Sequence, residues 1–443
     1  MNLRSTKNLS REEHTKNFDA ERNAEKPKGN LNLQTETEKE LQMATYDLTQ
    51  VELSALLTGN IDPSVREFVL SYLFDPDNPE NNGNGHGHDD DDHPGMGHGH
   101  DKHGDEDDHP GRGRGHDKHA DDDDDGPGRG HNGPPDDDDE VTVQITNGSH
   151  GVDPKADVYN LTADHGIVKT TAELDVIVQN VAGDSTLRVE GNHDVVVATG
   201  IGDNFVRLEG SGDYTVLTGS GNDTVFGGAG EDTMFGGNGH DSLVAGDGDN
   251  VQIHGEANND TIVGGDGDMS TLSGGDGRDV IYGGAGQDQV LTGGNGSDSL
   301  IAGDGDGQLL IGGDGADTIF GGDGANDTLS GGGGTDQLAA GDGEDQTVDG
   351  GDGNDTLWAG DGENTLFGGG GDDRFELDST TGNDTVVGGL GENTIDFNDR
   401  ASTDVESMDT VAGTTTIVFI DGQTVSATQV QILEFSDTTQ HLP

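Results

Sequence analysis

A tandem repeat constrains this chain more than any other feature of its sequence. Over residues 218–376 the unit reads G-G-x-G-x-D-x-apolar-x, as in GGAGEDTMF at 227–235 and GGNGHDSLV at 236–244. From residue 236 the units alternate between about nine and about ten residues, which gives a compound period of about nineteen. Such a period predicts a solenoid in which two half-turns form one rung.

The nine-residue halves hold an aspartate and an apolar residue in constant phase. The aspartates, nineteen residues apart, are Asp241, Asp260, Asp279, Asp298, Asp317, Asp336 and Asp355. The apolar residues, at the same spacing, are Leu243, Ile262, Ile281, Leu300, Ile319, Leu338 and Leu357. One apolar side chain per half-rung predicts very short strands that enclose a thin interior.

The ten-residue halves carry a second apolar row but a degenerate acidic one. The apolar row is Ile253, Leu272, Leu291, Leu310, Leu329 and Val348. The acidic position of these halves is read as Asn250, Met269, Asp288, Gly307, Asn326, Asp345 and Asn364. On this interpretation the chain has one complete carboxylate row and one eroded row.

The Gly-rich hexapeptides are expected to form the turns. Glycine at the first, second and fourth positions supplies positive-φ backbone and lets neighbouring turns approach closely. Rungs stacked about 4.8 Å apart bring successive carboxylates face to face. Two unit charges at that distance repel by about 3.5 kcal/mol at an effective dielectric of about 20, so the row needs counterions. Carboxylate and carbonyl oxygens favour Ca²⁺ over zinc or copper.

These motifs resemble the RTX (repeats-in-toxin, haemolysin-type) calcium-binding family. The resemblance implies an all-β fold, a calcium-bound parallel β-roll or RTX β-solenoid, with Ca²⁺ bound between neighbouring turns. The ligands that it implies are Asp223, Asp232, Asp241, Asp260, Asp279, Asp288, Asp298, Asp317, Asp336, Asp345, Asp355 and Asp373. The ten-residue halves and the turns at Met269 and Gly307 depart from the family pattern.

Composition divides the rest of the N-terminal part. Residues 1–37 are polar and predict a disordered tail, and Met43 is an alternative translation start. Residues 38–74 predict two short helices, with Asp62 as N-cap and Pro63 at the first helical position, that suit docking or oligomerisation. Residues 75–140 predict a disordered linker rich in His, Asp and Gly.

The remaining boundaries follow the β-type pattern. Residues 141–217 carry short apolar runs that predict degenerate solenoid repeats. Residues 218–387 are the expected RTX calcium-binding β-roll, and residues 388–443 the expected C-terminal β cap.

Charge and composition exclude several classes of partner and site. The chain has 89 acidic and 21 basic residues, so its net charge of −68 repels nucleic acid and anionic lipid. It has no cysteine, which excludes disulfides and thiolate metal sites. The sequence contains no run of about 18 apolar residues, so it predicts no membrane span. The basic N-terminus is not followed by an apolar stretch of the kind found in a secretory signal peptide.

The resemblance also implies a route of export. RTX proteins of Gram-negative bacteria leave the cell through type I secretion machinery, which reads an uncleaved C-terminal signal. Residues 400–443 fit that role, with the β-type runs TTTIVFI and VQILEF around a turn at Asp421 and Gly422. The same stretch also fits a capping β segment. We therefore expect a secreted, extracellular protein with the type I machinery as partner.

The sequence carries no H-E-x-x-H or G-x-S-x-G motif, which predicts a protein that is not an enzyme. The favoured function is a secreted calcium-binding protein of a surface, matrix or host-contact layer that folds on extracellular Ca²⁺. One alternative is cation sequestration, with Zn²⁺ or Ni²⁺ held by pairs such as His86 with His88 and His98 with His100. Another is the targeting and folding module of an RTX exoprotein whose enzymatic part is unrecognised.

Overall fold

A computed structural model describes residues 44–48, 50–74, 141–146, 156–172, 174–377, 382–397 and 399–442. All of them belong to one compact unit, residues 43–443. The predicted tail at 1–37 and the predicted linker at 75–140 lie outside the described residues.

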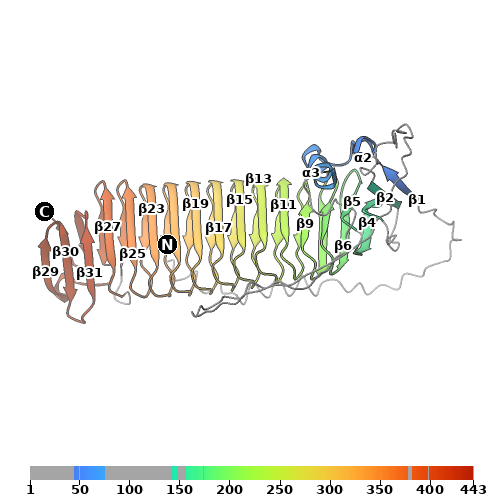
Figure 1. Cartoon of the computed structure of the whole chain (residues 1–443). Helices are drawn as coiled ribbons and strands as arrows, with labels where there is room; N and C mark the ends of the chain where they lie inside the picture. The colour runs from blue at the N-terminus through green and yellow to red at the C-terminus, as the bar shows by residue number, and fades with distance from the viewer. Residues whose placement is uncertain are drawn as a thin grey trace, which may run out of the picture. The chain divides into compact units, whose positions relative to one another are not determined.

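Two parallel β-sheets run the length of this unit, and the chain alternates between them (Figure 1). Sheet A contains β3 (Val158–Leu161), β5 (Val176–Gln179), β7 (Val195–Ala198), β9 (Tyr214–Leu217), β11 (Thr233–Asn238), β13 (Gln252–Ala257), β15 (Thr271–Gly277), β17 (Val290–Gly296), β19 (Leu309–Gly315), β21 (Thr328–Gly334), β23 (Thr347–Gly353), β25 (Thr365–Gly370) and β27 (Thr385–Leu390). Sheet B contains β4 (His165–Lys169), β6 (Ser185–Gly191), β8 (Asn204–Gly210), β10 (Thr224–Phe226), β12 (Ser242–Val244), β14 (Thr261–Val263), β16 (Val280–Tyr282), β18 (Ser299–Ile301), β20 (Thr318–Phe320), β22 (Gln337–Ala339), β24 (Thr356–Trp358), β26 (Arg374–Glu376) and β28 (Thr394–Phe397). One strand from each sheet forms a rung, so the predicted all-β parallel solenoid is confirmed.

The register of both sheets keeps the nineteen-residue rows in line. Leu272 lies opposite Leu291 in sheet A, and Ile281 lies opposite Leu300 in sheet B. These side chains are fully buried and belong to one continuous core between the sheets. The predicted thin interior, with one apolar residue from each half-rung, is therefore confirmed.

The two predicted N-terminal helices are present as α2 (Gln50–Leu56) and α3 (Pro63–Phe74). Asp62 caps α3, because its Oδ1 accepts the Ser64 backbone N–H at 2.9 Å. The prediction missed strand β1 (Ala44–Leu48), which pairs antiparallel with β2 (Val141–Thr146). β2 in turn pairs in parallel with β3, so β1 covers an edge that would otherwise be open.

The helices pack on the outer face of sheet A at its first strands. Leu53, Leu57 and Val69 form one buried cluster with residues of β3, β5, β7 and β9, including Val176 and Val196. The side-chain amide of Asn180 donates to the Leu56 carbonyl at 3.0 Å. The helical pair therefore docks on its own chain, and its expected role in oligomerisation stays a prediction.

Antiparallel strands end both sheets at the C-terminal side. β31 (Thr424–Thr428) and β32 (Ile432–Phe435) form the last parallel rung on β27 and β28. β29 (Val405–Val411), which follows the short 3₁₀ turn η3 (Ser402–Asp404), pairs with β30 (Thr414–Phe419); β30 pairs with β31, and β33 (Thr438–His441) with β32. Phe397, Phe419 and Phe435 pack together and close the interior. None of the helices within the described ranges is long and apolar enough to cross a membrane.

Candidate metal sites

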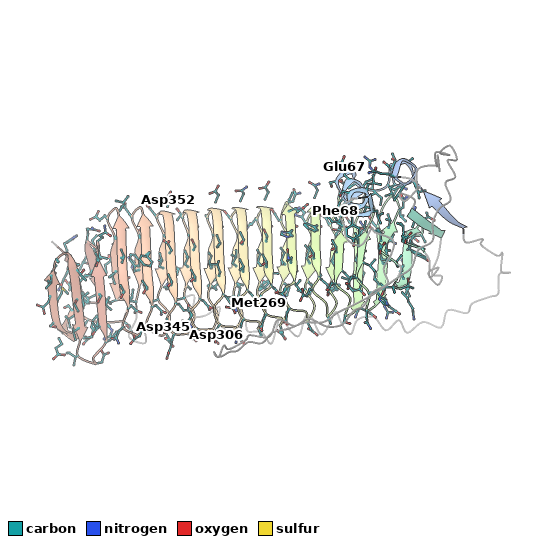
Figure 2. The ribbon with its side chains drawn as sticks, viewed as in Figure 1. Glu67, Phe68, Met269, Asp306, Asp345 and Asp352 are labelled. Atoms are coloured by element: carbon teal, nitrogen blue, oxygen red, sulfur yellow. The ribbon has the colours of Figure 1, made fainter. Side chains whose placement is uncertain are left out.

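The turns that lead into sheet B carry a row of buried aspartates along one edge of the roll. Residues of this row lie opposite one another in adjacent rungs and are 0–2% exposed. The row is Asp223, Asp241, Asp260, Asp279, Asp298, Asp317, Asp336, Asp355 and Asp373. We call this side the nine-residue edge; Figure 2 shows Asp352 on it, and Met269 and Asp345 on the opposite, ten-residue edge.

Each carboxylate of this row uses one oxygen in the fold. The Oδ1 of each aspartate from 241 to 373 accepts the backbone N–H of the aspartate one rung earlier, at 2.7–3.0 Å. The Oδ2 atoms of all nine are buried and have no hydrogen-bond partner. Because a buried carboxylate without a compensating charge is costly, this half of each group fits a cation ligand.

In seven of these turns a second oxygen approaches the free carboxylate atom above the first glycine of the turn. A Cβ at Gly293 would lie 2.5 Å from Asp298 Oδ2 and 2.6 Å from the Gly312 carbonyl oxygen of the next rung. A Cβ at Gly331 would lie 2.5 Å from both Asp336 Oδ2 and the Gly350 carbonyl oxygen. Two acceptors that converge without a donor fit a hard cation such as Ca²⁺.

The glycines of these turns have two separate functions. In the turn at 293–298, Gly294 and Gly296 have φ values of 112° and 150°, which side-chain-bearing residues rarely adopt. Gly293 does not have a positive φ, and its missing Cβ leaves room for the carboxylate. Positive φ is thus confirmed at the second and fourth positions, whereas the first glycine is needed for space.

Burial raises the pKa of these carboxyls above their ordinary value of 3.8. The pKa of Asp260 rises to about 7, mainly through loss of solvent, and the charges of Asp241 and Asp279 add to this rise. The same causes raise the pKa of Asp317 to about 6. In both residues the backbone N–H donor partly opposes the shift. A cation between the rungs would remove this penalty, because an opposite charge favours the ionised carboxylate.

The ten-residue edge holds a different row from the one predicted. In register with Asp232, the buried residues are Val251, Ser270, Gln289, Gln308, Asp327, Gln346, Asn364 and Asp384. Except at Asn364, this row lies one residue later than the sequence interpretation placed it. Asp288 and Asp345 are exposed and lie outside it. Counting two residues back from the apolar positions Leu291 and Val348 finds the correct residues, Gln289 and Gln346.

The residue that was assigned to the row instead forms the turn. Positions 250, 269, 288, 307, 326 and 345 all have positive φ, between 54° and 74°. The ten-residue half therefore absorbs its extra residue as one left-handed step. Asp232, which does lie in the row, has both oxygens hydrogen-bonded, to the backbone N–H groups of Tyr214 and Gly228.

Comparison with known protein families agrees with this geometry. Eight segments within residues 210–399 match the family model of the RTX calcium-binding nonapeptide repeat (4 copies). The chain carries RTX calcium-binding repeats. Ca²⁺ is the ion of these repeats. No curated protein matches the chain.

At each end of the aspartate row, the next rung has an asparagine at the same position. Asn204 precedes Asp223 in register, and Asn393 follows Asp373. Among the described residues no three His, Cys, Asp or Glu side chains converge on one point. Each turn of the nine-residue edge from Asp223 to Asp373 supplies one buried carboxylate, so backbone carbonyls have to provide the other protein ligands of a calcium ion.

Proposed function

We propose that this chain is a secreted, non-catalytic calcium-binding protein whose RTX repeats fold on Ca²⁺ outside the cell. The observation that carries this proposal is the row of nine buried aspartates whose Oδ2 atoms have no partner. Their proposed role is to hold Ca²⁺ between rungs, together with turn carbonyls. The calcium supplies the positive charge that the buried carboxylates lack.

The route and place of action follow from the same chemistry. Extracellular calcium modules bind at about 10⁻⁴–10⁻³ M, so cytoplasmic calcium would leave the repeats unfolded. The proposed export route is type I secretion, with the signal in the C-terminal segment that contains β29–β33. Outside, the folded roll would serve in a surface, matrix or host-contact layer. The alternative that relies on the histidine pairs concerns residues outside the described ranges and stays a prediction.

Calcium titration of the full chain tests the proposal. A net charge of −68 and an apolar content of 28% predict an unfolded polyanion at neutral pH in chelator. Added calcium should produce cooperative β structure in circular dichroism, and equilibrium dialysis at saturating calcium, followed by atomic absorption, should detect calcium bound to the protein. Full β signal in excess chelator at neutral pH would contradict calcium-dependent folding.

A further inference from the structure

Four buried amides occupy the ten-residue edge at positions equivalent to the calcium-facing aspartates. Gln289, Gln308, Gln346 and Asn364 are 0–2% exposed. A buried amide differs from a carboxylate because it offers hydrogen-bond donors as well as an acceptor. The contacts of these side chains therefore indicate whether their turns have room for an ion.

Gln289 satisfies its own turn and the preceding one at the same time. Its Oε1 accepts the Gly284 backbone N–H at 2.9 Å. Its Nε2 donates to the carbonyl oxygens of Gly265 and Gly267, one rung earlier, at 3.2 and 3.1 Å. The amide thus links two adjacent turns through their carbonyls, as a shared cation would.

The other amides of this edge also donate to turn carbonyls; Gln346 reaches the preceding rung, whereas Gln308 and Asn364 bond within their own turns. Gln346 accepts from the Gly341 N–H at 2.9 Å and donates to the Gly324 carbonyl of the preceding rung at 3.2 Å. Gln308 donates to Gly305 O at 3.1 Å. Asn364 donates to Ala359 O and Asp361 O at 2.8 and 2.9 Å.

The two ends of the aspartate row provide an internal comparison. Asn204 donates to the carbonyls of Gly200 and Gly202, both at 2.8 Å, and Asn393 donates to Gln429 O at 3.2 Å. Between them, every aspartate of the row leaves its Oδ2 without a partner. Within one chain, an amide at this position saturates turn carbonyls, whereas an aspartate leaves a free acceptor.

We propose that Gln289, Gln308, Gln346 and Asn364 replace calcium on the ten-residue edge. Each N–H group presents positive charge to a carbonyl that would otherwise ligate an ion, so a cation there would meet a like-signed dipole and occupied ligands. Calcium is then loaded along the nine-residue edge, and the turns of these four amides on the other edge are closed without metal. This inference rests on the proposed calcium binding of the aspartate row. The three aspartates of this edge, Asp232, Asp327 and Asp384, are outside the proposal.

The ion count of the wild-type chain is the first test. Nine aspartates enclose eight inter-rung positions on the nine-residue edge. Equilibrium dialysis at saturating calcium, followed by atomic absorption, should therefore find about eight ions per chain. A count near twice that number would place calcium on both edges and overturn the inference. A chain that binds no calcium would contradict the proposed function itself.

Paired variants on neighbouring half-rungs are the second test. Gln289→Met and Gln346→Met keep side-chain length but remove the donors, whereas Asp279→Asn and Asp336→Asn keep shape but remove the charge. We expect the glutamine variants to bind as many ions as the wild type, with a thermal midpoint lower by about 2–4 °C in saturating calcium. Each aspartate variant should lose about one ion or more. Loss of calcium from folded glutamine variants would overturn the inference; if either variant fails to fold, the wild-type count decides.

Discussion

At the residue scale, each aspartate of the nine-residue edge uses one carboxylate oxygen in the fold and, in the proposed function, offers the other to an ion. Asp298 Oδ1 accepts the Asp279 N–H at 2.8 Å, and Asp298 Oδ2 has no partner in the protein. One side chain therefore ties two rungs together by a hydrogen bond and contributes an oxygen to the space between them. Loss of one aspartate should therefore weaken calcium binding at both neighbouring sites.

The first prediction concerns Asp298→Ala and Asp317→Ala. Each should raise the calcium midpoint of folding and lower its cooperativity, because rungs interact mainly with their nearest neighbours. Loss of a direct ligand should weaken the adjacent sites by about tenfold or more. Circular dichroism during calcium titration measures both quantities. Asp352→Ala is the control, since this carboxylate lies on the same edge but is exposed (Figure 2). An equal effect of this variant would show that the change in net charge, and not the loss of a ligand, causes the shift.

The second prediction concerns pH in the absence of calcium. Burial raises the folded-state pKa of Asp223 to about 7 and that of Asp279 to about 6, against 3.8 for the free group. The folded chain then binds protons more tightly than the unfolded chain, so acid stabilises the metal-free fold. This stabilisation is complete below about pH 4 and is lost as the pH rises through about 6–7.

Circular dichroism in chelator should therefore detect more β structure at about pH 5 than at about pH 8. Asp223→Asn with Asp279→Asn is the informative variant, because it removes two titrating groups and keeps their shape. Its acid-induced transition should be shallower than that of the wild type. β structure that is insensitive to pH in chelator would contradict the raised pKa values.

The sequence predicted the aspartate row but misplaced its counterpart on the other edge. Asp241 to Asp355 were found because aspartate and apolar residue keep one phase over seven rungs. On the ten-residue edge the extra residue has no fixed chemistry: Asn250, Met269 and Gly307 all adopt positive φ. A count from the preceding glycines therefore ends one residue early. The amide contacts of Gln289 depend on carbonyls about twenty residues away, which no local pattern encodes.

At the element scale, the helical pair covers the outer face of the first strands of sheet A, so these strands are buried on both faces. β5 and β7 are buried at every residue, whereas β15 alternates between buried and partly exposed positions. This difference explains the continuous apolar runs VIV and VVVA, which are typical of strands covered on both faces. The helical spacing of apolar residues within 38–74 predicted the helices, but an apolar helix face does not specify the surface that it covers.

The third prediction tests this cover with Leu57→Ala. Leu57 is fully buried in the helix–sheet cluster, and its truncation should cost about 3 kcal/mol. The loss should be local, since solenoid rungs contact only their neighbours. Hydrogen exchange in saturating calcium should become faster in β3–β9 and stay unchanged in β17–β24. Glu67→Ala, at an exposed position of α3, is the matched control; uniform acceleration along the roll would contradict a local role.

At the whole-molecule scale, folding of the roll depends on neutralising its charge with calcium and on closing its C-terminal end. The aspartate row leaves one carboxylate oxygen per rung for an ion, so ion binding outside the cell would draw the unfolded chain into the folded state. The roll needs a closed end, because its apolar interior continues to the last rung. Val386 and Ile395 are fully buried, and the β31–β32 rung covers them. Phe419 helps to close it and lies 4.1 Å from the Arg400 guanidinium carbon, measured to the ring centroid.

The fourth prediction separates the cap from the export signal. Removal of residues 399–443 should retain the protein in the producing cell, because the proposed signal is then lost. Phe419→Ala keeps that segment but should cost about 3–5 kcal/mol in the folded cap, since the ring is fully buried. If the chain is exported unfolded, this variant should reach the medium at wild-type levels and then need more calcium to fold.

Immunoblots of cells and supernatant, with calcium titration of the secreted protein, measure both effects. Removal of residues 83–140 is the control for chain length, and it should leave export unchanged because these residues lie outside the C-terminal segment. Export of the truncated chain at normal levels would show that the signal lies elsewhere. Retention of Phe419→Ala together with the truncation would instead show that the exporter requires a stable cap, because the variant keeps the whole C-terminal segment apart from one side chain.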